Sequence, residues 1–269
     1  MTQSDTRPSP IPVAKLAAPS ARQLLGEARL AGDLGRMLLA LSRQPAGQVG
    51  NGRRVMCIPG FGGSDRYTFW LRRFLNQHGF KAEGWALGTN RGGDGLTFPI
   101  DYHPIEAAYK HRPELDVPRL VMQLREQVRQ RSEETGEQFA LVGHSLGGYL
   151  AREVTRQLPE QVDQLITFGS PIYGGPKYTA AARVFQRRGV DLDWIEAIIA
   201  EREKIAIAAP ITTIVSPSDG VVGYQAAIDR NQAHAKLIEI NAHHMGMAFN
   251  PAIWQLILSE LIAAARQSV

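Results

Sequence analysis

The sequence predicts an α/β fold: a mostly parallel sheet of about six strands with helices on both faces. Strand-like apolar segments alternate with longer amphipathic segments along most of the 269 residues, which is the order that a parallel sheet covered on both faces requires. Hydrophobic residues make up 44% of the chain and charged residues 21%, so a large core can form. This composition excludes a wholly disordered chain, a collagen and a coiled coil.

Six short apolar segments are expected to form the strands, because they are bounded by turn residues and several are rich in β-branched side chains. They span residues 54–58, 80–87, 139–142, 165–168, 211–215 and 237–240. The helices carry apolar residues at three- and four-residue spacing. We expect them at residues 64–78, with Ser64 as the N-cap, and at 118–134, 146–158 and 251–266.

The N-terminal part of the chain differs from the rest. Residues 1–19 are polar and proline-rich and predict a disordered arm. Residues 20–45 predict an amphipathic helix that docks on the main domain; the alternative is peripheral membrane or partner contact through residues 21–43. The main domain then spans residues 46–269. Its insertion at 172–209 is lid-like, and such long connections at strand ends are often substrate loops.

Charge, cysteine content and hydropathy exclude several functional classes. The net charge is +4 without any block of five basic residues, which argues against nucleic-acid binding. The single cysteine, Cys57, excludes an intramolecular disulfide and a multi-thiolate zinc site. Asp101, His103 and His111 lack a familiar metal-ligand spacing. Neither a membrane-spanning stretch nor a secretory signal is apparent, so we expect a cytoplasmic protein without a metal or organic cofactor.

Residues 143–148, Gly-His-Ser-Leu-Gly-Gly, contain the pattern G-x-S-x-G between an expected strand and an expected helix. So sharp a strand–turn–helix connection places the central serine in strained backbone geometry at the carboxyl end of the sheet, and only glycine fits on either side. Ser145 is therefore the candidate nucleophile. The alternative is an ordinary glycine-rich turn without a chemical role.

A serine hydroxyl needs an imidazole to take its proton and a carboxylate to orient that imidazole. Asp219 follows the fifth expected strand, and His243 and His244 follow the sixth. Because the carboxyl ends of parallel strands meet at one edge, both loops should converge on Ser145. Surface or packing roles are expected for the other candidates, which are Asp163, Asp191, Asp193, His78, His103, His111, His144 and His234.

Acyl transfer builds negative charge on a carbonyl oxygen, which preorganised backbone N–H groups stabilise. One donor is expected at Leu146, directly after the nucleophile, and the other at Phe61 in the glycine-rich loop that follows the first strand. Gly60 and Gly62 would let this backbone approach the substrate. Phe61, Leu146, Tyr173 and part of the insertion are expected to line the acyl pocket.

Five motifs, in this order, resemble those of the α/β-hydrolases of the bacterial lipase and esterase type. They are IPGFGG (58–63), LVGHSLGG (141–148), ITFGSPIYGG (166–175), VSPSDGVV (215–222) and HHMGM (243–247). In that group the catalytic histidine is commonly followed by one residue and then glycine, which favours His244 over His243. The chain departs from the group at Pro59, where many lipases carry histidine. The resemblance implies a six-stranded core.

These features together predict a serine hydrolase that cleaves small-molecule or lipid carboxylic esters through an acyl-enzyme on Ser145. His244 is expected to act as the base, and Asp219 is expected to orient it. Two other interpretations remain open. An acyltransferase or a thioesterase would use the same triad with a different acceptor or leaving group, and a binding module of this fold would leave the triad unused.

Overall fold

The computed structural model describes residues 16–26, 35, 47–97, 99–103 and 113–267. This part of the chain contains a parallel sheet of six strands with the order β2-β1-β3-β4-β5-β6. The strands are β1 (Arg54–Ile58), β2 (Lys81–Gly84), β3 (Phe139–His144), β4 (Val162–Phe168), β5 (Ile211–Val215) and β6 (Lys236–Glu239). The predicted α/β class and the predicted parallel sheet are confirmed.

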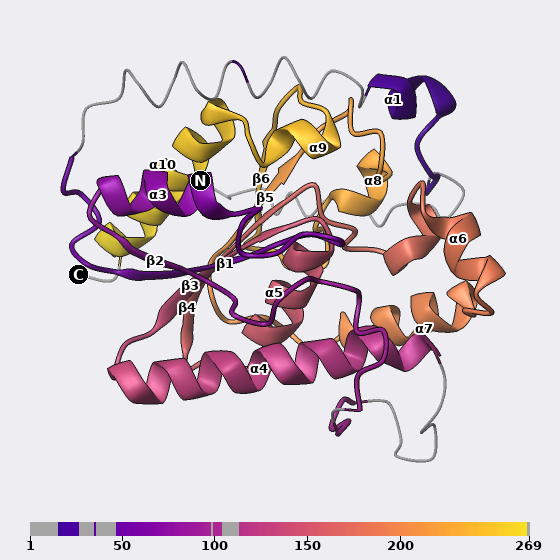
Figure 1. Cartoon of the computed structure of the whole chain (residues 1–269), viewed down its shortest axis with the longest axis horizontal. Coiled ribbons are helices and arrows are strands. Elements are labelled where there is room, and N and C mark those ends of the chain that lie inside the picture. Colours follow the sequence, from indigo (N-terminus) through magenta and orange to yellow (C-terminus); the bar gives the residue numbers. More distant parts are fainter. Residues whose placement is uncertain (1–15, 27–34, 36–46, 98, 104–112, 268–269) are drawn as a thin grey trace, which may run out of the picture.

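Helices cover both faces of the sheet (Figure 1). The described α-helices are α1 (Ala21–Gly26), α3 (Phe69–Gln77), α4 (Asp116–Thr135), α5 (Leu146–Gln157), α6 (Ala182–Arg187), α7 (Leu192–Arg202), α8 (Tyr224–Ala227), α9 (His244–Met247) and α10 (Pro251–Gln267). Two short 3₁₀ turns, η3 (Pro113–Leu115) and η4 (Gly175–Tyr178), accompany them. Among the described helices, none combines the length and the apolar character needed to cross a membrane.

The pleat of the central strands divides the core into two layers, because successive side chains point to opposite faces. Val55 of β1 belongs to the layer beneath α3 and α10, which is centred on Trp254. Its neighbour Met56 belongs to the opposite layer, with Leu124 of α4 and Leu150 of α5. β1, β3, β4 and β5 therefore consist mostly of buried residues, as strands covered on both faces do.

The first helix of the main domain begins later than the sequence predicted. Ser64 is not its N-cap, because residues 64–67 form a turn in which the N–H of Tyr67 donates to the carbonyl oxygen of Ser64 at 2.8 Å. α3 starts at Phe69 after Thr68, whose side chain makes no capping hydrogen bond. A serine followed by a turn and a serine that caps a helix share the same local pattern, since both bond nearby backbone groups.

Strand lengths also differ from the prediction. β2 is shorter, because the N–H of Trp85 donates to the Asp65 carboxylate at 3.0 Å instead of continuing the ladder. β3 and β4 are longer, because they pair along the sheet until His144 lies opposite Phe168. This extension brings the end of β3 directly to the serine that follows it.

The insertion after β4 is fastened to α5 by buried charges. Arg152 of α5 donates to Asp229 at 2.9 and 3.0 Å, and to Glu203, which follows α7, at 2.8 Å. Arg156, one turn further along α5, donates to the same Glu203 at 2.9 Å. The sequence analysis did not identify this cluster, because its members lie far apart in the sequence.

A third carboxylate, Glu153, continues this cluster toward the loop after β2. It accepts hydrogen bonds from the Arg202 side chain and, at 3.0 Å, from the hydroxyl of Tyr102. The Arg202 guanidinium also lies 3.7 Å from the centre of the Tyr102 ring. Burial raises the pKa of Tyr102 well above its ordinary value, so this hydroxyl stays protonated and can donate.

Little of the predicted N-terminal helix lies within the described residues. The structure gives Ser20, α1 and a helical residue 35, whereas residues 27–34 and 36–45, and residues 1–15 of the predicted arm, lie outside the described part. Leu24 and Leu25 of α1 are 50% and 78% exposed. The side-chain amide of Gln23 donates to the carbonyl oxygen of Pro217 at 2.8 Å, so α1 touches the loop after β5.

Candidate active site

Ser145 occupies the tight turn between β3 and α5. Its backbone angles are φ 53° and ψ −127°, a conformation that costs a residue with a Cβ about 1–3 kcal/mol and that clusters at functional sites. The turn is compressed against the end of β1. A Cβ at Gly147 would lie 2.5 Å from the carbonyl oxygens of Ile58 and Pro59. The strained serine expected from G-x-S-x-G is therefore present.

Asp219 and His244 form a buried hydrogen-bonded pair. Asp219 lies in the loop after β5, and His244 is the first residue of α9, after β6. Nδ1 of the imidazole is 2.8 Å from Oδ2 of the carboxylate, and each residue is 3% exposed. The N–H groups of Val221 and Val222 donate to Oδ1 at 2.8 and 2.7 Å. The alternative histidine, His243, has a buried Nδ1 without a partner among the described residues.

One hydroxyl joins the loop of the acid to the loop of the histidine. Ser216 Oγ donates to the carbonyl oxygen of Ala242 at 2.7 Å and accepts from the N–H of Ala242 at 3.1 Å. It also accepts from the N–H of Ser218 at 3.0 Å. Ser216 therefore joins the two loops just beyond the last described backbone bond between these chain segments, which runs from the N–H of Ile240 to the carbonyl oxygen of Val215. A serine after a strand gave no signal of this role in the sequence.

The end of β4 brings the serine and the Asp219–His244 pair to the same place. The N–H of Ser145 donates to the carbonyl oxygen of Phe168 at 3.0 Å. The next residue, Gly169, has φ 58°, and a Cβ there would lie 3.2 Å from His244 Nδ1 and 3.3 Å from Asp219 Oδ2. Gly169 belongs to the motif ITFGSPIYGG, but its position against Asp219 and His244 was not foreseen.

His144, adjacent to the nucleophile, has a packing role, as expected. Its ring centre lies 4.7 Å from that of His244 and 4.8 Å from that of Phe168. Its Nδ1 is 2.9 Å from the hydroxyl of Tyr67. Burial, followed by the charge of His244, lowers the pKa of His144 well below its ordinary value. The ring is therefore neutral, and it buttresses His244 without competing for its proton.

Two backbone N–H groups next to Ser145 are available to a ligand. Leu146 is the first residue of α5, so its N–H has no acceptor within the helix. The loop after β1 approaches from the other side, since a Cβ at Gly60 would lie 3.0 Å from Cβ of Ser145. Within the described part of the chain, the N–H of Phe61 donates to no acceptor. These are the two donors that the sequence analysis expected.

Asn90, which the sequence analysis missed, holds the loop after β1 in shape. Its side-chain amide donates to the carbonyl oxygen of Pro59 at 2.8 Å, and its Oδ1 accepts from the N–H of Gly92 at 3.0 Å. Its backbone pairs with Gly62 and Gly63 at 2.7 and 2.8 Å. Asn90 is fully buried. Its place in a glycine-rich stretch without strand or helix pattern gave no sign of this contact.

The remaining predicted pocket residue, Tyr173, is partly exposed and is held by hydrogen bonds to α8 and to the loop after it. Its hydroxyl accepts from the N–H of Arg230 at 3.2 Å, and its own N–H donates to the carbonyl oxygen of Ala226 at 3.0 Å. Burial raises the pKa of Tyr173 to about 12. No hydrogen bond or ring contact described for Tyr173 joins it to Ser145, so its role in the acyl pocket stays a prediction.

The described residues contain neither a cluster of metal ligands nor a reactive thiol. They contain no group of three His, Cys, Asp or Glu side chains arranged to hold a metal ion. Of the three residues considered as metal ligands, His111 lies outside the described residues. Burial raises the pKa of the Cys57 thiol to about 12, so this side chain is an inert part of the core.

Comparison with a family model gives a partial match. The model of the palmitoyl protein thioesterase family matches residues 110–201, about a third of the chain. The matched stretch includes α4, β3, the turn with Ser145, α5, β4, α6 and most of α7, and it ends before Asp219 and His244. No curated protein matches the sequence.

Solved structures resemble about four-fifths of the chain. A monoacylglycerol lipase of Paleococcus ferrophilus has 16% identity and a TM-score of 0.53, over 78% of this chain and 94% of that one. A soluble variant of monoglyceride lipase from Saccharomyces cerevisiae has 13% identity and a TM-score of 0.53, over 81% of this chain and 89% of that one. A lipase-esterase related protein from Clostridium acetobutylicum has 10% identity and a TM-score of 0.52, over 80% of this chain and 96% of that one. These likenesses show that the chain shares the fold of these proteins, a parallel sheet with helices on both faces.

Proposed function

We propose that this protein is a serine hydrolase that cleaves carboxylic esters through an acyl-enzyme on Ser145. The observation that carries the proposal is the buried 2.8 Å hydrogen bond between His244 and Asp219. It lies at the sheet edge where Ser145 occupies a strained turn. An imidazole held in one tautomer by a carboxylate is the arrangement that activates a serine hydroxyl. The fold that the chain shares with lipases supports an ester as the substrate.

The proposed reaction has two halves. In the first, Ser145 Oγ attacks the acyl carbon while Nε2 of His244 takes the hydroxyl proton, and the carbonyl electrons move onto the oxygen. The N–H groups of Phe61 and Leu146 stabilise this oxyanion, each worth about 10²–10³ in turnover. The imidazolium returns its proton to the leaving alcohol as the carbon–oxygen bond breaks. In the second half, water replaces the alcohol and releases the acid.

Asp219 has a positional and electrostatic role in this scheme. With Oδ1 held by two backbone N–H groups, Oδ2 is fixed toward Nδ1 of His244. The carboxylate then favours the tautomer that carries its proton on Nδ1, so that Nε2 can accept the serine proton, and it stabilises the imidazolium that forms. The neutral ring of His144 packs beside this imidazole and adds no competing charge.

A thioesterase is the second candidate function. The match of residues 110–201 to the palmitoyl protein thioesterase family model favours it. The acyl-enzyme would be the same, and the leaving group would be a thiolate, which needs less help from the acid form of His244. An acyltransferase would differ in the second half only, where an alcohol replaces water.

The test compares matched oxygen and sulfur esters of one acyl chain. We expect the oxygen ester to turn over, with kcat reduced by at least about 10⁴ in Ser145→Ala. Ser259→Ala is the control, because Ser259 lies on the exposed side of α10. A kcat/KM at least tenfold higher for the thioester would identify the second candidate, and transfer to an added alcohol would indicate an acyltransferase. No turnover of either ester by the folded protein would leave the binding module as the interpretation.

A further inference from the structure

A basic and apolar surface lies beside the candidate active site. We call it the α6 rim and define it by Phe61, Arg91, Arg183, Val184, Arg187 and Arg188. Phe61 is 55% exposed and Val184 is 49% exposed, and all four arginines are exposed. α6, which carries most of this surface, projects at one end of the molecule (Figure 1). Large exposed apolar side chains next to one another are uncommon on a monomer and mark interaction sites.

Described contacts join the parts of the rim. The ring of Phe61 packs edge-on against that of Phe185 on the inner side of α6, with their centres 6.5 Å apart. Gly92 lies against the other side of Phe61, since a Cβ there would be 3.4 Å from the ring. This contact places Arg91, the preceding residue, next to Phe61. The rim is therefore one continuous surface that begins at the loop of the proposed oxyanion hole.

The arginines of the rim have no acidic partners in the described part of the chain. None of these four guanidinium groups forms an ion pair with a described residue. Within α6, Arg183 and Arg187 lie one helical turn apart. At the opposite end of the molecule, by contrast, Arg53 pairs with Asp163 at 2.8 Å, and Lys81 pairs with Glu137 at 3.2 Å. The positive charge of the rim is thus left for a partner outside the chain.

We propose that the α6 rim docks on the surface of an anionic lipid bilayer. The arginines match the negative headgroups, and each basic side chain near such a surface favours binding. The apolar Phe61 and Val184 stand among them, in position to enter the boundary between headgroups and acyl chains. These exposed apolar side chains favour a bilayer over a nucleic acid, whose backbone offers them no apolar contact. The surface would act independently of whether Ser145 cleaves esters.

The first test measures co-sedimentation of the full chain with phosphatidylcholine vesicles that contain 0% or about 30% phosphatidylglycerol. We expect binding to the anionic vesicles only, and release as the salt concentration rises. The variant with Arg183→Gln, Arg187→Gln and Arg188→Gln should bind about 100-fold more weakly. A charge-matched control carries Arg73→Gln, Arg129→Gln and Lys236→Gln on α3, α4 and β6, and it should bind like the wild type.

The second test locates the contact. In Val184→Cys, the introduced thiol is exposed, whereas Cys57 is fully buried, so a polarity-sensitive fluorophore labels position 184 alone. We expect a blue shift on addition of anionic vesicles. The same label at Gln130→Cys, exposed on α4, should show no shift. Circular dichroism and thermal unfolding establish that each variant is folded.

Three results would overturn the proposal. One is equal binding of the wild type to neutral and anionic vesicles. Another is equal loss of binding in the α6 triple variant and the charge-matched control, which would indicate net charge or a different surface, such as the predicted helix at residues 20–45. The last is binding of a duplex oligonucleotide that depends on the α6 arginines while vesicles are not bound. None of these measurements requires ester cleavage.

Discussion

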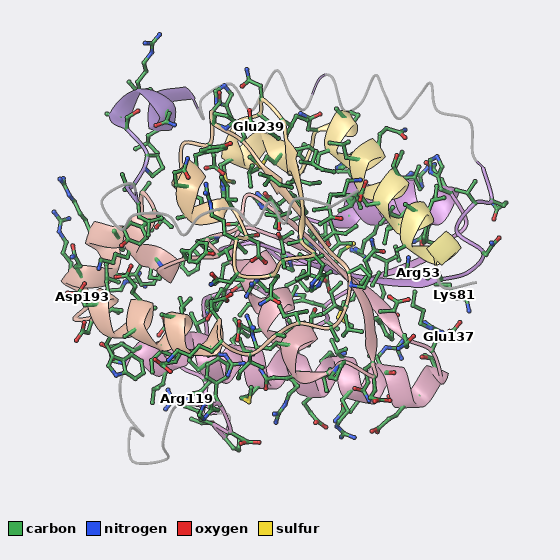
Figure 2. All side chains as sticks on the ribbon, turned by 180° about the vertical axis from the view of Figure 1, so that it is seen from behind. Arg53, Lys81, Arg119, Glu137, Asp193 and Glu239 are labelled. Carbon is green, nitrogen blue, oxygen red and sulfur yellow. The ribbon has the colours of Figure 1, made fainter. Side chains whose placement is uncertain are left out.

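The two ends of the sheet are built differently. At the amino end, charged side chains are paired with one another: Arg53 bonds Asp163 and the carbonyl oxygen of Leu261, each at 2.8 Å. Figure 2 shows Arg53, Lys81 and Glu137 gathered at this end of the molecule. At the carboxyl end, Ser145 is strained, and the arginines of the α6 rim lack acidic partners among the described residues. The charged side chains described at the amino end bond one another, whereas Ser145 and the rim arginines at the carboxyl end remain available for a ligand.

This difference shows where the chain tolerates backbone strain and N–H groups without an acceptor. A strained serine and open N–H groups persist only because the strands and helices around them are fully packed. The Asp219–His244 pair is an intermediate case, because its carboxylate is satisfied, whereas Nε2 of His244 is the nitrogen that takes the proton in the proposed reaction. We therefore expect substitutions at the carboxyl end to affect catalysis more than stability, and those at the amino end to do the reverse.

Removal of the negative charge at Asp219 should have the largest effect on catalysis. Asp219→Asn keeps an oxygen for the N–H groups of Val221 and Val222, but its amide nitrogen favours the wrong tautomer of His244. We expect kcat for esters to fall about 10⁴-fold. Asp163→Asn at the amino end is the matched control and should leave kcat unchanged. A similar loss in both variants would contradict the proposed role of Asp219.

Removal of Glu153 should have the largest effect on stability. The side chain is 1% exposed and is bonded by Arg202 and Tyr102, so Glu153→Ala leaves buried cations uncompensated. We expect the free energy of unfolding to fall by about 3–5 kcal/mol, as measured by urea denaturation. Glu133→Ala, which removes an exposed partner of Arg129, should change it little. Equal effects would show that the buried cluster is not what fastens the insertion.

Two glycine substitutions separate backbone strain from contact with the triad. Gly169 and Gly136 have φ values of 58° and 67°, so Ala costs about 1–2 kcal/mol of backbone strain at either position. A Cβ at Gly136 meets nothing within 4 Å, whereas one at Gly169 presses on His244 and Asp219. Both variants should therefore lose similar stability, but only Gly169→Ala should lose activity, about tenfold or more. Full activity in Gly169→Ala would mean that the pair tolerates displacement.

The smallest effect is expected at the amino end. Arg53→Gln removes the ion pair with Asp163 and the hydrogen bond to Leu261, both only partly shielded from water. The free energy of unfolding, measured by urea denaturation, should fall by about 1 kcal/mol. The kcat and KM for the ester should stay unchanged. A change in kcat would show that the two ends are coupled.

The fold was predictable because local and long-range signals agree. Strands such as Arg54–Ile58 and Ile211–Val215 have the bounds expected from their apolar runs. G-x-S-x-G located the sharp turn because its constraints are local, as Gly147 illustrates. The order of the strands then brought Asp219 and His244 together, although they are distant in sequence from Ser145.

What could not be predicted depends on contacts between distant side chains. Asn90 and Ser216 hold the two sides of the site, yet nothing in their neighbourhood distinguishes them from other polar loop residues. Glu153 lies in a helix whose charges suggest exposure, and its burial follows only from the position of Arg202. Such partners become visible once the chain is folded, because sequence separation hides them.

The central claim is that Ser145 is activated by His244 at the carboxyl end of the sheet. Labelling with a fluorophosphonate, followed by peptide mapping, tests it most directly, since the reagent reacts with activated serines whatever their natural substrate. We expect stoichiometric modification at Ser145 that is absent in Ser145→Ala and strongly slowed in His244→Ala. No modification of the folded wild type, with or without detergent, or modification that persists at the same rate in His244→Ala, would contradict it.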